Sequence, residues 1–396
     1  MATARQTLTG LGIGLAAAGA AAAVGVVAER ATRGGQLETG TLPSSAYDYP
    51  AGREAVVIAD DGVPLHVEVD EPEQAAAGRP TIVFSHGYCL NLRSWVLQRR
   101  ALARAGYRLV LWDQRSHGRS GHSGAEHCTI DQLGRDLRRV IAEHAPDGPL
   151  ILVGHSMGGM TTMSLAGQFP ELVTERVVAV GLVATSAGGS AMVSLGFGPM
   201  IGGLIGRVGP GLLSRLGRFQ HRLDAVRKVG RGVEDVLVAR YSFDSPMSPE
   251  AVRFVGDLIF QTPFSVMGDF LPALDSLDER AALSHFKGID CLVLNGLGDL
   301  LTPPEHSAEI VRLIPGAEHV VIKDAGHVVM LEHPEVVNEQ LLDLALRGQR
   351  AVSDHLAVSR KPRVKRVLTD LTRMRRKGST AKPAKSAPIP RPASRD

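Results

Sequence analysis

The sequence predicts an α/β protein with a doubly wound, mostly parallel β-sheet and an inserted helical cap. Short apolar runs alternate with segments of helical spacing, and each run ends at a loop rich in Gly, His or Asp. The alternation is interrupted once, by Gly-, Leu- and Met-rich sequence at residues 186–285. Parallel strands that are buried on both faces have such continuous apolar sequences, and the site of such a sheet lies at the carboxyl ends of its strands.

The composition is that of a folded chain. Its 396 residues are 44% hydrophobic and 21% charged, which excludes a wholly disordered protein and allows two or three units, or one large domain with an insertion. No apolar stretch after the N-terminal segment is long and clean enough for a polytopic membrane protein. The three cysteines, Cys89, Cys128 and Cys291, are too few and too scattered for a disulfide framework or a Cys-rich zinc site.

Residues 1–30 form an N-terminal hydrophobic segment. Residues 6–28 are uncharged and consist mostly of Ala, Gly, Val and Leu, which is long enough for a helix to span a bilayer. We expect a single-pass anchor and a membrane-associated protein. A cleaved signal peptide also fits, with Arg5 as its positive region and residues 26–28 as its cleavage site, and would give a secreted or cell-envelope protein. A soluble Ala-rich arm is the third interpretation.

The first part of the core is expected at residues 50–185. It begins with a hairpin of residues 55–59 and 65–69 around the turn Asp60-Asp61-Gly62. Strands and helices then alternate, because apolar runs of strand length are separated by segments with helical spacing. The buried strands are predicted at residues 81–85, 108–112, 150–153 and 177–184, and the helices at residues 95–105, 131–144 and 157–169.

The helical cap is expected at residues 186–285. An uncharged run continues from the strand at residue 177 to residue 206. Residues 191–216 offer enough apolar side chains to line a pocket for an acyl chain, and they could equally serve only to pack the cap onto the core.

The core resumes at residues 286–350, with a buried strand at 291–294, and residues 351–396 form a basic tail that we expect to be disordered. Residues 359–396 hold 13 Lys and Arg against two acidic residues, while the rest of the chain holds 31 against 39. Residues 361–376 also have the apolar spacing of an amphipathic surface helix, which favours contact with anionic lipid. No specific nucleic-acid partner is expected, because the tail has no aromatic residue for base stacking.

The motif Gly154-His155-Ser156-Met157-Gly158 lies between the strand at 150–153 and the helix at 157–169. A G-x-S-x-G sequence in that context predicts a cramped turn that exposes the serine hydroxyl at the amino end of a helix. We therefore predict that Ser156 is a nucleophile. The alternative is an ordinary serine in a Gly-rich turn.

Two later segments supply an acid and a base. Asp299 follows the strand at 291–294, and His327 lies near the end of the globular region. The order Ser156, Asp299, His327 is the one expected when acid and base come from loops after the last two strands of such a sheet. His327 would take the Ser156 proton, and Asp299 would fix the imidazole tautomer and stabilise the imidazolium. A carboxylate of the cap in place of Asp299 remains an alternative.

Residues 53–347 resemble a capped serine hydrolase of the α/β-hydrolase fold, of the esterase and lipase type. The matching pieces are His86-Gly87, residues 113–120, the Ser156 elbow, Asp299, Gly326-His327 and Glu332-His333-Pro334. The resemblance implies an oxyanion hole formed by the backbone N–H groups of Tyr88 and Met157. Ser116 departs from the pattern, which commonly has Gly at that position. A serine at the elbow argues against the branches of the fold that use a carboxylate nucleophile.

These residues predict a serine hydrolase that cleaves a carboxylic ester, with a lipid or acyl ester favoured by the apolar cap, through an acyl-enzyme. An acyltransferase that uses the same three residues and a noncatalytic member that binds a small ligand are the alternatives. We expect no cofactor. We also expect no metal site, because the neighbouring histidines and cysteine lack zinc-like spacing; these residues are His117, His122, His127 and Cys128.

Overall fold

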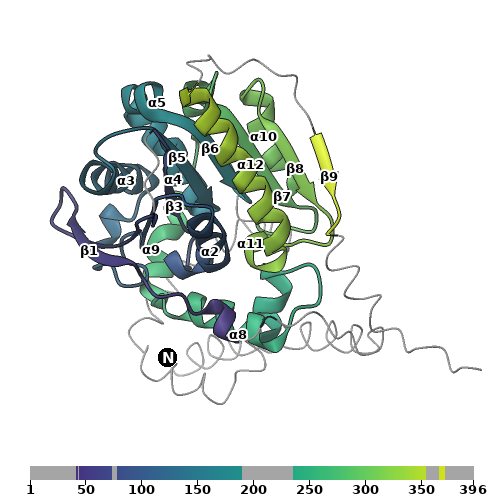
Figure 1. Ribbon diagram of the computed structural model, residues 1–396. Helices are drawn as coiled ribbons and strands as arrows, with labels where there is room; N and C mark the ends of the chain where they lie inside the picture. The colour runs from purple at the N-terminus through teal and green to yellow at the C-terminus, as the bar shows by residue number, and fades with distance from the viewer. Residues whose placement is uncertain (1–41, 43, 74–77, 190–234, 354–364, 371–396) are drawn as a thin grey trace, which may run out of the picture.

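The computed structural model describes residue 42 and residues 44–73, 78–189, 235–353 and 365–370 (Figure 1). Its described strands form one mixed sheet in the order β1-β2-β4-β3-β5-β6-β7-β8-β9. The first elements are η1 (Ser44–Tyr47), β1 (Arg53–Ile58), β2 (Pro64–Asp70), β3 (Thr81–Ser85), η2 (Leu92–Trp95), α2 (Val96–Arg104), β4 (Leu109–Trp112), η3 (Ala125–His127), α3 (Ile130–His144), β5 (Leu150–His155), α4 (Met157–Gln168), α5 (Pro170–Arg176) and β6 (Val177–Val183). They are followed by α8 (Pro249–Phe260), α9 (Phe264–Asp275), η4 (Ala282–Phe286), β7 (Asp290–Gly296), α10 (Pro304–Leu313), β8 (Glu318–Ile322), α11 (Val329–Glu332), α12 (Pro334–Ser353) and β9 (Lys365–Leu368).

The predicted fold class is confirmed. Strands β1 and β2 form an antiparallel hairpin, and β2 pairs antiparallel with β4. All other neighbours, from β4 through β3 and β5 to β9, run parallel. The turn of the hairpin contains Gly62 at φ 87°, in the left-handed region that glycine adopts without strain. Each strand and helix predicted between residues 55 and 184, and the strand predicted at 291–294, is present within a few residues of its predicted bounds.

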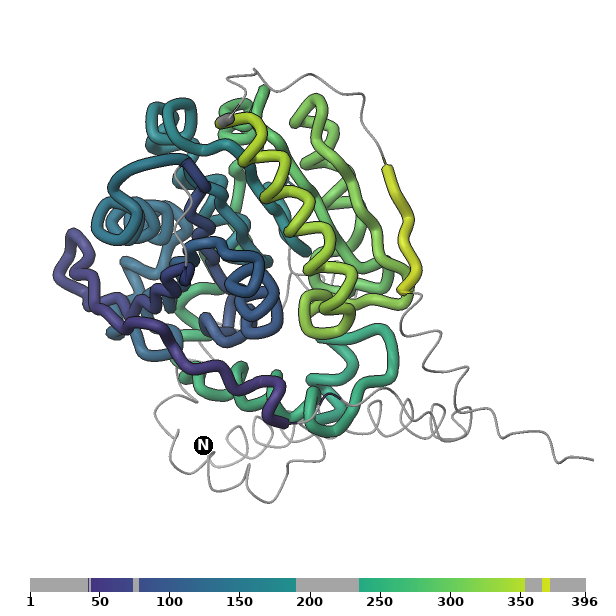
Figure 2. Tube along the Cα trace, viewed as in Figure 1, coloured from purple at the N-terminus to yellow at the C-terminus, as the bar shows by residue number. Residues whose placement is uncertain are grey.

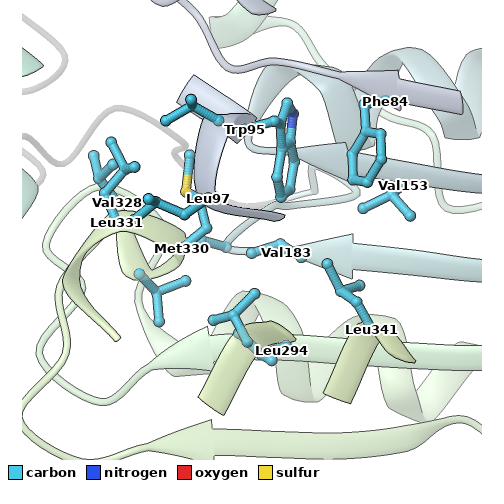
Figure 3. Packing of buried hydrophobic residues seen from close by; sticks show 14 of the residues in the cluster. Phe84, Trp95, Leu97, Val153, Val183, Leu294, Val328, Met330, Leu331 and Leu341 are labelled. Carbon is cyan, nitrogen blue, oxygen red and sulfur yellow. The ribbon is translucent and has the colours of Figure 1, made fainter. Parts of the chain in front are cut away.

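The core consists of two apolar layers, one on each face of the sheet. Along β5, Ile151 and Val153 pack into one layer while Leu150 and Leu152 pack into the other, as the period of two in a strand requires. Helices α2, α11 and α12 contribute to the first layer, and α3, α4 and α10 to the second (Figures 1 and 2). Figure 3 shows the first layer in detail, with labelled side chains that include Phe84, Trp95, Val153, Val183, Leu294, Met330 and Leu341.

Between β6 and β7 the chain leaves the sheet and forms α8 and α9 beyond the ends of the strands (Figures 1 and 2). Helix α8 begins at a capping serine, since the Ser248 side chain accepts a hydrogen bond from the Ala251 amide. The apolar stretch at residues 191–216 lies outside the described residues, as does the N-terminal segment at residues 1–30. Among the helices that the structure describes, none combines the length and the hydropathy that a membrane span needs.

Strand β9 corrects the prediction for the tail. The sequence predicted disorder or a surface helix here, but Lys365–Leu368 pairs in parallel with β8 and forms the edge of the sheet. Arg366 also forms an ion pair with Glu318 and a hydrogen bond to Gln340. For residues 365–368 the prediction was wrong, because the hydrogen-bonding groups of β8 and these side chains come from elsewhere in the chain and composition alone could not indicate them. Residues 354–364 and 371–396 of the tail lie outside the described residues.

Candidate active site

Ser156 lies between the last residue of β5 and the first residue of α4. Its φ of 51° and ψ of −118° are unusual for a residue with a side chain and indicate a strained turn. A Cβ atom on Gly154 would overlap the backbone of Gly158, and one on Gly158 would overlap the carbonyl group of Ser85. The Ser156 amide donates to the Val183 carbonyl at 3.0 Å, which fixes the turn to β6. The motif therefore forms the elbow that the sequence predicted.

Asp299 and His327 are in direct contact. The Nδ1 atom of His327 lies 2.9 Å from Oδ2 and 3.1 Å from Oδ1 of Asp299, and both side chains are buried. Asp299 also accepts hydrogen bonds from the Leu301 and Thr302 amides and from the Thr302 hydroxyl, at 2.8 to 2.9 Å. Burial raises the pKa of Asp299, but the contacts with His327 and Thr302 outweigh burial and hold the pKa below its usual value. Asp299 is thus an ionised carboxylate that receives the Nδ1–H of His327.

His155 connects the elbow to the loop of His327. Its Nε2 donates to the His327 carbonyl oxygen at 3.0 Å, and the two ring centroids are 4.8 Å apart. Burial and the neighbouring His327 lower the pKa of His155 to about 3, so the ring is neutral. In the part of the chain that the structure describes, the Ser156 hydroxyl forms no hydrogen bond to His327. Such bonds are often long before substrate binds and shorten in the complex.

The backbone at Gly87 and Tyr88 passes directly against the elbow. A Cβ atom on Gly87 would lie 2.6 Å from Nδ1 of His155 and 3.2 Å from Cβ of Ser156. The loop is fixed by His86, whose Nδ1–H donates to the Gly87 carbonyl at 2.8 Å. The sequence-predicted amides of Tyr88 and Met157 therefore both belong to segments next to Ser156.

The side chain of Tyr88 has a role that the sequence did not indicate. Its hydroxyl donates to the Met267 carbonyl of α9 at 2.5 Å. Its ring packs against a cluster of buried hydrophobic side chains that includes Val266 and Phe270 of the same helix. Because Met267 is 179 positions away, no local pattern could have predicted this contact. The loop beside Ser156 is consequently attached to the segment between β6 and β7.

Glu332 is a second residue whose importance was underestimated. The sequence places Glu332 only in the matching piece Glu332-His333-Pro334, but its buried carboxylate accepts hydrogen bonds from three backbone amides. They are those of Asp244 at 3.1 Å, Ser245 at 2.6 Å and Gly326 at 2.6 Å. Glu332 thereby joins the segment before α8 to the residue that precedes His327. The only available signal was its place six residues after Gly326.

The structure does not bring together the histidines and the cysteine that were considered as metal ligands. His117 is buried against His86 with the ring centroids 5.5 Å apart, whereas His127 is exposed. Within the described residues these side chains form no group that could hold a metal ion.

A different group of side chains has suitable spacing for a metal. Glu54, His66 and Glu68 each place one ligand atom within 4.8 Å of the others. Arg119 donates to Glu54 at 2.7 Å, however, and Arg99 forms an ion pair with Glu68. The carboxylates already face guanidinium groups, so this cluster is an ion-pair network and we assign it no metal.

Comparisons with known proteins agree with this geometry. Residues 82–340 match the alpha/beta hydrolase family. The chain is 26% identical over 271 residues to the dihydrolipoyllysine-residue acetyltransferase component of an acetoin cleaving system from Pseudomonas putida, covering 68% of this chain and 64% of that protein. It is 27% identical over 260 residues to the sn-1-specific diacylglycerol lipase ABHD11 of Mus musculus, covering 65% of this chain and 78% of that protein.

Solved structures show the same fold. A thermophilic esterase from Thermogutta terrifontis superposes with a TM-score of 0.57 at 21% identity, over 75% of this chain and all of that one. The enol-lactonase from Burkholderia xenovorans also gives 0.57, at 23% identity, over 74% of this chain and all of that one. From the match over residues 82–340, together with the sheet and the elbow, we conclude that the chain belongs to the alpha/beta hydrolase family.

Proposed function

We propose that the protein is a serine hydrolase that cleaves a carboxylic ester through an acyl-enzyme on Ser156. The observation that carries the proposal is the buried Asp299–His327 pair, whose His327 carbonyl accepts a hydrogen bond from His155, the residue before Ser156. A serine hydroxyl is a weak nucleophile by itself, and an adjacent histidine oriented by a carboxylate is the usual means of activating it.

In the first step the Ser156 oxygen forms a bond to the ester carbonyl carbon, and its proton passes to Nε2 of His327. The Asp299 carboxylate stabilises the imidazolium that results. The negative charge on the carbonyl oxygen would be met by the amides of Tyr88 and Met157, of which the second lies at the amino end of α4. The bond to the alcohol then breaks, and the alcohol leaves with the His327 proton.

In the second step water takes the place of Ser156 as nucleophile. His327 removes its proton while the water oxygen forms a bond to the acyl carbon; the bond from that carbon to Ser156 then breaks, and the proton returns to the Ser156 oxygen. The products of this step are a carboxylic acid and the free enzyme, and the reaction as written consumes only the ester and water.

An apolar acyl group is supported by the surroundings of the elbow. Met157 and Met160 of α4 pack with Val266, Phe270 and Leu274 of α9, next to the Tyr88 ring. Side chains of this kind favour an acyl chain over a charged group. The names of the two solved neighbours, an esterase and a lactonase, point to the same class of bond.

A panel of p-nitrophenyl esters, graded from acetate to palmitate, tests the proposal. We expect multiple turnovers, a preference among chain lengths, and no turnover by Ser156→Ala. Saturable ester binding without turnover would instead support a noncatalytic member of the fold. A long-chain alcohol added to the assay identifies a transferase, because the new ester would then exceed the free acid.

We also propose that residues 6–28 anchor the protein in a membrane and that the basic residues of 359–396 add attraction to anionic lipid. A spanning helix does not depend on charge, so full-length protein should remain in the membrane fraction through a high-salt wash. Soluble protein whose sequence begins near residue 28 would replace this proposal with a cleaved signal peptide.

A further inference from the structure

Strand β9 lies at the edge of the sheet beside β8 (Figure 1). In the sequence it comes after residue 340, the last residue that matches the family. The loop that follows β8 carries His327. At the end of the two strands, the Lys323 amide donates to the Leu368 carbonyl at 2.9 Å, which extends the pairing into the start of that loop. The C-terminal segment is therefore in contact with the backbone that leads to His327.

Two residues further along the chain, Asp370 makes a second contact to the same loop through His333. Oδ2 of Asp370 lies 3.1 Å from Nδ1 of His333, and Nε2 of His333 lies 2.9 Å from the Asp324 carbonyl oxygen. Both side chains are buried, with 6% of Asp370 and 2% of His333 exposed. Each ring nitrogen of His333 thus faces an oxygen atom, one of the Asp370 carboxylate and one of the Asp324 backbone carbonyl.

Asp324, whose carbonyl oxygen lies beside His333, has a strained backbone conformation. Asp324 has a φ of 53°, in the left-handed region that residues with a side chain rarely adopt. Such a conformation persists only when surrounding contacts impose it. The His333 bond to the carbonyl of Asp324 is one of these contacts, and His327 follows three residues later.

We propose that Asp370 is a positioning residue for His327. Through His333 it fixes the Asp324 carbonyl and with it the turn that presents His327 to Ser156 and Asp299. This inference rests on the proposed function, and it assigns a part in that function to a residue just after β9, outside the matched family region. A loop displaced by the loss of these contacts would misalign the general base, and small misplacements reduce rates strongly.

The test uses the full chain with Asp370→Ala. Lys365→Ala is the matched control, since Lys365 is an exposed residue of β9, the strand that directly precedes Asp370. In Asp370→Ala we expect kcat to fall about 10-fold to 100-fold with KM within about twofold of wild type, because the alignment of the base is lost while substrate binding is kept. Deuterium uptake by the peptide that covers residues 322–330 should become faster in Asp370→Ala and stay unchanged in Lys365→Ala.

A double-mutant cycle with His333→Ala shows whether Asp370 acts through His333. The double variant should lose no more kcat than His333→Ala alone, because the two residues belong to one chain of contacts. Additive losses would contradict the proposed path. If Asp370→Ala does not accumulate in folded form, Asp370→Asn, which keeps the size and one acceptor oxygen, takes its place in both comparisons.

If Asp370→Ala has the kcat of wild type and the same deuterium uptake by residues 322–330, the inference is overturned. A fall in kcat that only matches the fraction of unfolded protein would also overturn it. Ser156→Ala, measured beside these variants, separates this failure from a failure of the proposed function. If Ser156→Ala keeps wild-type activity, the proposed function fails, while the uptake of residues 322–330 still reports whether Asp370 holds the loop.

Discussion

His155 donates a hydrogen bond from Nε2 to the backbone carbonyl oxygen of His327, across 3.0 Å and 172 positions of sequence. The bond joins the residue before Ser156 to the residue that we propose as its base. It therefore sets the distance between the elbow at the end of β5 and the loop after β8 without using the reacting atoms of either side chain.

Replacing His155 tests the importance of this bond. His155→Leu removes the donor, and we expect kcat to fall about 10-fold while KM changes little, since a misaligned base affects the chemical step. His155→Gln keeps an N–H donor in a similar position and should retain most of the activity. Equal kcat values for wild type and His155→Leu would show that other contacts suffice to place His327.

Asp299→Asn should lower kcat by up to about 10⁴-fold, because an amide no longer stabilises the imidazolium and favours the wrong tautomer of His327. The matched control is Asp278→Asn, which changes a carboxylate of the cap that pairs with Arg280 at the surface. Steady-state kinetics on one ester compares the two variants. A dead Asp278→Asn beside an active Asp299→Asn would mean that the cap supplies the acid.

Tyr88→Phe removes the hydroxyl that binds the Met267 carbonyl and leaves the backbone amide in place. We expect a loss of about 1 kcal/mol in the free energy of unfolding and a higher KM, because the attachment of α9 to the loop beside Ser156 is weakened. Tyr107→Phe is the control, since it removes a hydroxyl bonded to Gln349 at 3.3 Å on another part of the molecule. A KM change of the same size in both variants would argue against a specific role of the Tyr88 hydroxyl.

Glu279→Gln should stabilise the protein in a pH-dependent way. Burial and the nearby Asp131 carboxylate raise the pKa of Glu279 to about 7, above the value of about 4.3 for an unfolded chain. The folded state therefore binds more protons between these values, and stability falls as pH rises through them. Glutamine resembles the protonated form, so the variant should exceed wild type by about 2 kcal/mol at pH 8 and match it at pH 4.

Urea denaturation at the two pH values measures this difference. Glu175→Gln serves as a control because Glu175 is exposed. An equal advantage of Glu279→Gln at both pH values would show that packing, and not proton binding, is responsible.

The elements that the sequence predicted are those with a local signal. The apolar run of β5 and the glycines at 154 and 158 are adjacent in the chain, and their spacing alone required a sharp turn at Ser156. The pairing of Asp299 with His327 followed from their order along the chain, since loops after neighbouring parallel strands meet at one edge of the sheet.

The contacts that escaped prediction join distant parts of the chain. Tyr88 meets Met267, and Glu332 meets Ser245, across separations at which side-chain identity gives no indication of the partner. Strand β9 was missed for the same reason, because a basic segment forms a strand here only when β8 offers it an edge. The domain boundaries on either side of residues 190–234 stay predictions.

The most direct test of the account is to identify the residue that becomes acylated during turnover. The protein is mixed with an excess of a p-nitrophenyl ester, quenched in acid within the first turnovers, digested and examined by mass spectrometry. We predict an added acyl group on the peptide that contains Ser156, formed at a rate no slower than kcat, with neither adduct nor turnover in Ser156→Ala. Turnover that persists at the wild-type rate in Ser156→Ala, or an adduct on a different residue that forms at the rate of turnover, would contradict it.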